Sequence, residues 1–413
     1  MRVERMVESR AAVLDLSLEE ASGLMAVGRG LASKQRRWGQ DHVAEERSVI
    51  ECTPYGHGRW SVRVPDAVGV IRVGAWQLVV EPKVPLSHLI HLFERSGAFP
   101  RIDATLASLA TAESLWPMVA AWYLAALERL LRSGLSSGYQ PAREELPAAR
   151  GRIAVGATSR AFYKGRITLD CEYEDFDVDT ALNRMLKAAA TAASASSALE
   201  WDLRRRARRA TNHMEGVGRL VASDHLDARA ERHTSRYALP LELARHVLSA
   251  TGRGIDVGEA HGHAFLIRTP DMVEEGLRRV AVDALRDRTV VSKRTWFLTG
   301  SHHSLTPDLV FGRRAVGDVK YKVWSGDWDR ADLYQLVAFA TGFGVSDALR
   351  VDFASTDHGD SAVRVGPVQL AACDWVCDTG SPHDAERALG VRLRAWWDTA
   401  QRRLSAEAKA GPA

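Results

Sequence analysis

Apolar and polar residues alternate in the first part of the chain and then take up helical spacing. Residues 48–84 contain short alternating runs separated by Gly and Pro, a pattern typical of β-strands. From about 89 to 135 the apolar residues recur three and four positions apart, which predicts helix with a core-facing stripe of Trp, Tyr and Leu. Residues 151–174 are predicted to form a β-hairpin with Lys164 and Gly165 at its turn. Further helices are predicted at 179–198, 199–221 and 240–250.

The last third of the chain mixes helix and strand patterns. Amphipathic helices are predicted at 271–288 and 329–344, and a long closing helix at 384–410. Strands are predicted at 295–300, 305–312, 315–324 and 348–355. The order predicts a multidomain α+β protein with a β-rich N-terminal domain (1–100), a mostly helical middle domain with a β-hairpin (101–255) and a C-terminal α/β domain (256–413).

Composition is that of an ordinary globular protein. The chain has 413 residues, 46% hydrophobic and 26% charged, enough to bury a core in two or three domains. No apolar run approaches the roughly 18 residues of a membrane helix, and the first residues lack the apolar stretch of a signal peptide. We therefore expect a cytoplasmic protein without membrane contact. Cys373 and Cys377 have no second Cys/His pair beside them, so we expect reduced thiols and no zinc site.

Positive charge is concentrated in the middle of the chain. The formal net charge is only +3, but five of the six residues from Arg204 to Arg209 are arginine. Such a local excess suits a polyanion, and it makes Arg204, Arg205 and Arg206 candidate DNA-binding residues. A solvated helix face is an equally good explanation of the same residues.

Charged residues, whose burial costs free energy, lie on predicted strands in the segment TPDLVFGRRAVGDVKYK, residues 306–322. Alternate side chains of a strand share a face, so Asp318, Lys320 and Lys322 are expected on one side. Asp308 lies on the preceding strand, and Gly312 with its flanking arginines predicts the turn, so the two carboxylates can converge. Two neighbouring carboxylates repel each other, and a divalent cation would relieve that repulsion. Oxygen ligands of this kind favour Mg²⁺ or Mn²⁺.

A lysine two residues after the second carboxylate suits phosphodiester hydrolysis. Lys320 could orient or help deprotonate a water, and Lys322 could contact DNA phosphate. With Pro307 before Asp308, and Asp318-x-Lys320 after it, the segment resembles the PD-(D/E)xK nucleases. A β-hairpin with surface charges is the alternative.

The resemblance to these nucleases adds two candidate residues on helices. In that fold an acidic residue of the preceding helix often joins the metal site, and Glu274 or Glu275 lies on such a helix. In one branch a glutamine follows on the next helix, where Gln335 stands.

A resemblance to one family covers most of the chain. The segments VGVIRVGAWQLVVEPKVP, ELPAARGRI, CEYEDFDVDTALNRMLKAA, AFLIRTPDMVEEGLRRV, VGDVKYK and DLYQLVAFA occur in the order typical of McrC-like proteins. The combination of Asn183-Arg184, the Asp318-x-Lys320 strand and Gln335 is similar to the nuclease subunits of McrBC restriction systems. Arg268 and Val273 depart from that family, which usually has an acidic and an aromatic residue at these two positions.

The McrC resemblance implies a function, partners and roles for residues. It implies a DNA endonuclease subunit of an anti-phage restriction system, with a C-terminal PD-(D/E)xK domain that cuts DNA, methylated DNA included, by metal-dependent hydrolysis. The β-rich N-terminal part and the middle part would engage a McrB-like AAA+ GTPase hexamer and stimulate it. The residues implied are Asp308, Asp318 and Glu274 as ligands of Mg²⁺ or Mn²⁺, with Lys320 catalytic and Gln335 in support.

Two other functions and several other residues remain open at this point. The chain could be a stand-alone repair or mobile-element nuclease, or an inactive adaptor that only activates the GTPase. It contains no G-x-x-x-x-G-K-[ST] loop, so we expect it to bind no nucleotide itself. The pairs His261/His263 and His302/His303 could ligate metal but are expected to be ordinary turn or surface residues. Lys83 also matches the McrC-like family, but the sequence suggests no chemical role for it.

Overall fold

The computed structural model describes residues 2–35, 49–100, 115–224, 228–250, 262–324, 326–359, 361–378 and 380–410. The fold is mixed α+β, as predicted. Contacts between Cα atoms divide the chain into two compact units, one made of Met1–Leu115 with Ala260–Ala413 and the other of Trp116–Glu259. The three domains with limits near 100 and 255 stay a prediction. Among the described helices, none combines the length and apolar character needed to cross a membrane.

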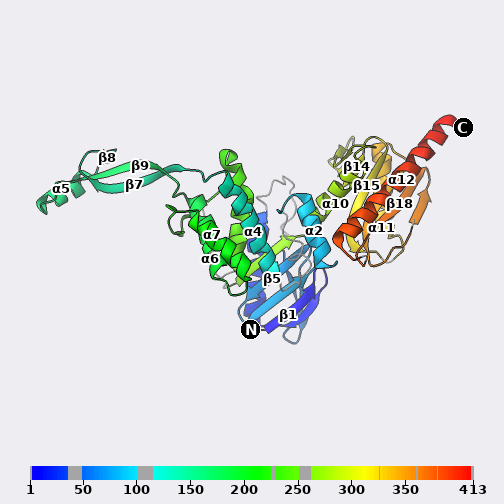
Figure 1. Cartoon of the computed structure of the whole chain (residues 1–413). Coiled ribbons are helices and arrows are strands. Elements are labelled where there is room, and N and C mark those ends of the chain that lie inside the picture. The colour runs from blue at the N-terminus through cyan, green and yellow to red at the C-terminus, as the bar shows by residue number, and fades with distance from the viewer. Residues whose placement is uncertain are drawn as a thin grey trace. The chain divides into compact units, whose positions relative to one another are not determined.

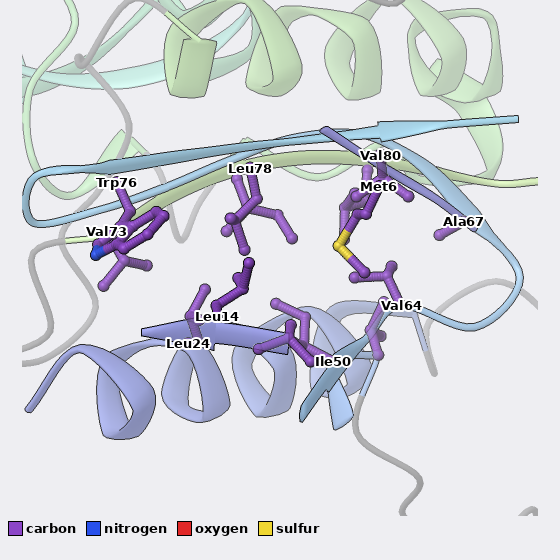
Figure 2. Close-up of a cluster of buried hydrophobic side chains, with 14 of the residues drawn as sticks. Met6, Leu14, Leu24, Ile50, Val64, Ala67, Val73, Trp76, Leu78 and Val80 are labelled. Carbon is purple, nitrogen blue, oxygen red and sulfur yellow. The ribbon is translucent and has the colours of Figure 1, made fainter. Parts of the chain in front are cut away.

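The first unit begins with two small sheets that pack around a hydrophobic core. The four-stranded sheet has the order β1 (Arg2–Val7), β6 (Trp76–Glu81), β5 (Ala67–Val73) and β10 (Gly262–Arg268), and the three-stranded sheet the order β2 (Ala12–Asp15), β4 (Arg59–Arg63) and β3 (Glu51–Gly56). Helix α1 (Leu18–Gln35) also packs here, and Figure 2 shows Leu78 of β6 directed toward Leu14 and Leu24 in the opposite layer. The strands predicted within 48–84 are confirmed. The strands β1 and β2 and helix α1 were not predicted.

Helix α10 (Pro270–Ala284) and helix α2 (Leu86–Ser96) pack closely in the same unit. A Cβ atom on Gly276 would lie 2.5 Å from the carbonyl oxygen of Leu92, so the contact depends on glycine. Proline at the first position of α10 suits a helix start, because its missing N–H would have no partner there. This packing fixes the helix that carries Glu274.

A six-stranded mixed sheet forms the rest of the first unit (Figure 1). Its order is β11 (Val291–Ser292), β14 (Leu309–Phe311), β15 (Ala315–Val323), β16 (Asp347–Ala354), β18 (Val368–Val376) and β17 (Ser361–Val365). Strands β15, β16 and β18 run parallel, and β11, β14 and β17 pair antiparallel with their neighbours. Every residue of β16 is buried, as expected of a central strand. The predicted strands at 315–324 and 348–355 are confirmed, and the one at 305–312 is divided into a short strand at Ser304–Leu305 and β14. Strands β17 and β18 were not predicted.

Helices cover this sheet. Helix α11 (Arg330–Phe343) packs through Leu336, Phe339 and Ala340 on Val316 of β15 and Ala348 of β16. It begins at Asp329, whose side chain accepts a hydrogen bond from the Ala331 N–H at 2.8 Å, and ends at Gly344 in the left-handed region. Helix α12 (Pro382–Ala410) packs on β18 and α10. A two-stranded sheet of β12 (Trp296–Phe297) and β13 (Ser304–Leu305) precedes β14.

The second unit combines helices with a long two-stranded arm. Its helices are α4 (Leu115–Arg132), α6 (Ala181–Ala195), α7 (Trp201–Asn212), the 3₁₀ helix η2 (Arg232–Tyr237) and α9 (Ala238–Ala250), and its strands are β7 (Gly138–Leu146), β8 (Arg152–Ile153) and β9 (Leu169–Asp177). Strands β7 and β9 pair along nine residues each, and α5 (Val155–Tyr163) lies at the end of this arm (Figure 1).

The predicted hairpin at 151–174 is wrong in its first strand. Only Arg152 and Ile153 pair with β9, and the next residues form α5. Lys164 and Gly165 do lie in a turn, but Gly165, at φ +77°, ends a helix rather than joining two strands. The long partner of β9 is β7, a strand that was not predicted because its alternation is weak.

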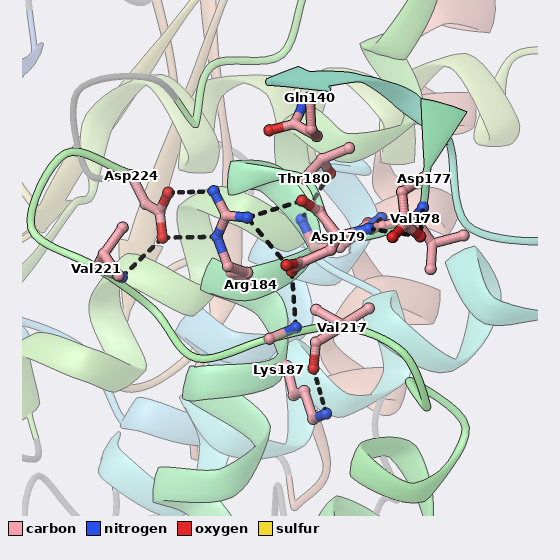
Figure 3. A network of polar contacts seen from close by, with 12 residues as sticks. Gln140, Asp177, Val178, Asp179, Thr180, Arg184, Lys187, Val217, Val221 and Asp224 are labelled. Carbon is pink, nitrogen blue, oxygen red and sulfur yellow. Dashed lines mark hydrogen bonds and ion pairs between the residues drawn. The ribbon is translucent and has the colours of Figure 1, made fainter. Parts of the chain in front are cut away.

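Asn183 and Arg184, two of the family-like residues, tie the second unit together. The buried Asn183 amide donates to the Ser136 and Val178 carbonyls at 3.0 and 2.7 Å and accepts from the Tyr237 hydroxyl at 2.9 Å. Arg184 makes a two-pronged ion pair with Asp224 and donates to the Asp179 carbonyl at 2.7 Å (Figure 3). Their role in this structure is therefore to hold loops onto α6.

Candidate active site

Asp308 and Asp318 lie side by side on the β14–β15 hairpin. Leu309 pairs with Gly317 in an antiparallel ladder, so Asp308, directly before Leu309, faces Asp318, directly after Gly317. The Asp308 carboxylate accepts a hydrogen bond from the Val319 N–H at 3.1 Å. Both aspartates are almost fully buried, with 7% and 4% of their surfaces exposed. Two carboxylates are thus held together in a place where water screens them poorly.

Glu274 of α10 joins this pair, and its neighbour Glu275 does not. Lys293 lies between Glu274 and Asp308, with its ammonium 3.0 Å from the Glu274 Oε2 and 3.2 Å from the Asp308 Oδ1. Glu275 instead pairs with Arg278 and Arg279 of the next helical turn. Of the two helix glutamates suggested by the sequence, the structure brings Glu274 to the aspartates.

Lys320 is held from both sides. Its ammonium lies 2.6 Å from the Asp318 Oδ2 and donates to the Gln335 Oε1, also at 2.6 Å. Asp332, one turn before Gln335 on α11, lies 3.6 Å away on the same helix face. The predicted residues Asp308, Asp318, Lys320, Glu274 and Gln335 thus form one cluster, and their roles in catalysis and metal binding stay a prediction.

Burial and like charge raise the proton affinity of this cluster. The pKa of Glu274 is raised to about 7, first by burial and then by the Asp308 carboxylate, against the opposing effect of Lys293. The pKa of Asp318 is raised to about 6 by burial and by Asp308, against the opposing effect of Lys320. Burial lowers the pKa of Lys320, but Asp318, Asp332 and Asp308 outweigh it, so the pKa is raised and the ammonium stays charged. The carboxylates therefore bind a proton or another cation readily.

The carboxylate oxygens suit a hard divalent cation. Among the described residues, no three His, Cys, Asp or Glu side chains are arranged so that they could hold a metal ion as they stand. Lysine ammonium groups instead contact Glu274, Asp308 and Asp318. The three carboxylates nevertheless form a donor set of oxygens only, which fits Mg²⁺ or Mn²⁺ once an ammonium moves aside.

A second group of charges lies beside the first and was missed in the sequence. Asp332 is buried between three cations, with its Oδ2 2.7 Å from Lys322 and 3.5 Å from Arg350. Arg350 is fully buried over the rings of Trp324 and Trp328, at 4.8 and 4.1 Å from their centroids. Lys322 is thus tied to α11, although 44% of its side chain is exposed. The spacing of Asp332 and Gln335, three residues apart on a predicted helix, was the signal available for Asp332.

The other candidate residues that the structure describes lie on other elements. Arg204, Arg205 and Arg206 lie on α7 of the second unit, where Arg206 makes a two-pronged ion pair with Glu128. His302 and His303 are exposed. His261 lies outside the described residues, and of His263 only the backbone is described, in β10. None of the four cysteines, all of which the structure describes, forms a disulfide.

Lys83 has a structural contact that the sequence did not reveal. Its ammonium lies 3.5 Å from the Tyr321 carbonyl oxygen and 4.9 Å from the centre of the Tyr321 ring. Tyr321 stands between Lys320 and Lys322 on β15. Lys83 therefore contacts the strand that carries the candidate site.

Comparison with known proteins identifies a family and similar solved structures. A model of the family described as McrBC 5-methylcytosine restriction system component matches residues 62–349. A chain in the refined half-complex from a tetradecameric assembly of Thermococcus gammatolerans McrB AAA+ hexamers with bound McrC is 16% identical, covers 95% of this chain and 100% of its own length, and superposes with a TM-score of 0.60. A chain in the Thermococcus gammatolerans McrBC complex is 14% identical, with 83% and 99% covered and a TM-score of 0.41. No curated protein sequence matches the chain.

Proposed function

The chain belongs to the family of McrBC 5-methylcytosine restriction system components, and we propose that it is the DNA-cleaving subunit of such a system. The six-stranded sheet with α10, α11 and α12 is then a PD-(D/E)xK nuclease domain. One observation carries this proposal: Glu274, on a separate helix, meets Asp308, Asp318 and Lys320 of the hairpin in one largely buried cluster. An ordinary hairpin with surface charges would leave these side chains in water.

Each residue of the cluster has its own proposed role in phosphodiester hydrolysis. Glu274, Asp308 and Asp318 would hold Mg²⁺ or Mn²⁺, which when bound supplies positive charge for the phosphate and a more acidic water. Lys320 stays protonated beside Asp318 and acts as a cation that orients the water or the phosphate, rather than as a base. Gln335 fixes the direction of the Lys320 ammonium. Lys322, whose side chain is 44% exposed, would contact a neighbouring DNA phosphate.

A McrB-like AAA+ GTPase is the partner that the family membership suggests. The Thermococcus gammatolerans assembly that resembles this chain contains McrB hexamers with bound McrC. In the second unit, the end of the arm exposes large apolar side chains, with Tyr163 93%, Ile167 83% and Val155 72% exposed. Exposed apolar groups gathered on one element are typical of a protein-binding surface. We propose that the arm binds the partner ring.

Cleavage by site variants tests this function. The full chain, with its McrB-like partner, GTP and Mg²⁺, is incubated with methylated and unmethylated plasmid. Asp318→Ala, Lys320→Ala and Glu274→Gln are each expected to lower the cleavage rate by at least about 100-fold, because each removes a group that stabilises the transition state. Glu275→Gln is the matched control, since it removes the neighbouring carboxylate that points away, and it should cut like the wild type.

The outcomes separate the alternative functions. Retained cutting by Asp318→Ala or Lys320→Ala would overturn the assignment of the site. Cutting by the purified chain without partner or GTP would favour a stand-alone nuclease. Intact stimulation of the GTPase with no cleavage under any divalent metal would favour an adaptor without nuclease activity.

A further inference from the structure

Lys293 has a position that no motif of the sequence suggested. It directly follows β11, whose Val291 and Ser292 pair with Phe311 and Val310 of β14. Its backbone is therefore fixed at the edge of the six-stranded sheet, next to the strand that follows Asp308. From there its side chain reaches both Glu274 and Asp308, with nitrogen-to-oxygen distances of 3.0 and 3.2 Å.

The ammonium of Lys293 lies where a cation shared by these two carboxylates would lie. Glu274 and Asp308 come from different elements, α10 and the start of the hairpin, and Lys293 contacts an oxygen of each. Without a positive charge between them the two carboxylates would repel each other at close range. A divalent cation that binds the same oxygens must therefore displace this ammonium.

Lys293 is also the more exposed and the less extensively bonded of the two lysines in the cluster. Its side chain is 39% exposed, and among the described residues its polar contacts are with the two carboxylates. Lys320 is 20% exposed and is held by Asp318, Gln335 and Asp332 together. A lysine stem has four rotatable bonds and can turn its ammonium into water at little cost.

We propose that Lys293 is an internal counter-ion, which neutralises Glu274 and Asp308 in the free protein and competes with the divalent metal for them. This inference rests on the proposed function, because it concerns the same metal site. It predicts that the free subunit binds metal more weakly than its three carboxylates would otherwise allow. Once the metal has displaced it, the Lys293 ammonium would pair with a DNA phosphate.

Binding of Mn²⁺ to a Lys293 variant tests the competition directly. Isothermal titration calorimetry with the full chain at pH 8, where the Glu274 carboxyl is mostly ionised, gives the Kd for Mn²⁺ without DNA or turnover. Lys293→Met keeps most of the length of the side chain and removes the charge, and the Kd is expected to fall at least about fivefold, the low end of common coupling between two ligands. Lys293→Arg keeps a cation and should stay close to the wild-type Kd.

Matched controls separate this local effect from a change in net charge. Arg313→Met removes one exposed positive charge from the turn between β14 and β15, and at physiological salt it should change the Kd less than twofold. Asp308→Asn should abolish the binding. Thermal unfolding is a second readout. In EDTA, Lys293→Met should have a lower Tm than the wild type. In saturating Mn²⁺, its Tm should rise by more than the wild-type Tm does. Lys293→Gln replaces Lys293→Met if the latter does not fold.

The results distinguish the inference from the function on which it rests. If the wild type binds Mn²⁺ and Lys293→Met binds it equally or more weakly, the counter-ion role is wrong and the nuclease proposal stands. If neither binds Mn²⁺, the metal site itself is wrong and the inference falls with it. Tighter binding by Lys293→Met but not by Arg313→Met supports both.

Discussion

Each of the three proposed metal ligands faces a lysine ammonium. Asp318 pairs with Lys320, and Glu274 and Asp308 share Lys293. These ion pairs offset part of the cost of burying carboxylates, but two of the carboxyl groups still have raised pKa values. Asp308, Asp318 and Lys320 could be proposed from sequence because strand alternation and a tight turn bring near neighbours together. Lys293 could not, because its proximity depends on how separate elements pack, and the only sequence signal for Asp332 was its helical spacing from Gln335.

The raised pKa of Glu274 predicts a pH-dependent stability. Its ordinary value is 4.5 and its value in the fold is about 7, so between these pH values the folded state binds more protons than the unfolded state. The contribution of Glu274 to stability is therefore full below pH 4.5 and is lost as the pH rises through about 7, by up to about 3 kcal/mol. In metal-free buffer, Glu274→Gln should flatten the decline of Tm between pH 5 and 7.5. Glu275→Gln should keep the wild-type slope, and an unchanged slope in Glu274→Gln would contradict the environment described for this carboxyl.

The elements around the site are joined by close backbone contacts. Gly317 on β15 lies so near β16 that an added Cβ would be 3.0 Å from the Leu349 carbonyl oxygen. Gly276 of α10 approaches α2 still more closely. Helix α11 contributes Asp332 and Gln335 from one face, because residues three apart are neighbours on a helix. The helices themselves were predicted from apolar spacing, whereas their contacts were not.

A methyl group at Gly276 should separate α10 from α2. Gly276→Ala places a Cβ 2.5 Å from the Leu92 carbonyl oxygen, so backbone must move. We expect a net loss of about 1–2 kcal/mol, because an overpacking cost of about 1–3 kcal/mol exceeds the gain in helix propensity. Gly390→Ala on α12 is the control: its Cβ would meet Ala284 at an ordinary 3.6 Å, and the Tm should stay equal or rise. Equal Tm values for Gly276→Ala and the wild type would refute the close contact.

The first unit is built from both ends of the chain. Strand β10 follows the second unit and completes the sheet of β1, β6 and β5. Glu8, fully buried after β1, accepts hydrogen bonds from the Lys83 N–H at 3.3 Å and the Thr269 hydroxyl at 2.8 Å. Lys83 in turn contacts Tyr321 on the strand of the candidate site. The N-terminal sheet and the strand of the candidate site are therefore joined by polar contacts, and the contacts of Lys83 lie outside its own segment.

Apolar residues at the end of the arm should govern partner binding. Tyr163→Ser and Ile167→Ser each remove a side chain that is more than 80% exposed, with 93% and 83% respectively, and so should not unfold the chain. We expect each to weaken stimulation of a McrB-like GTPase by about tenfold in apparent affinity, as for a central interface residue. Val391→Ser on α12, 58% exposed, is the control and should have no effect. Binding of Mn²⁺ should be unchanged in all three variants. Full GTPase stimulation by both arm variants would show that the end of the arm does not bind the partner.

The sequence by itself determined the α+β class, most helices and central strands, and the group Asp308, Asp318 and Lys320, because apolar periodicity and a short hairpin are local properties. It misjudged 151–174, where a glycine that ends a helix looked like the turn of a hairpin. Only the tertiary structure decided that Glu274 rather than Glu275 faces the aspartates, and that Lys293 lies between the carboxylates. The orientation of a helix and the meeting of distant segments depend on packing, which no short stretch of sequence encodes.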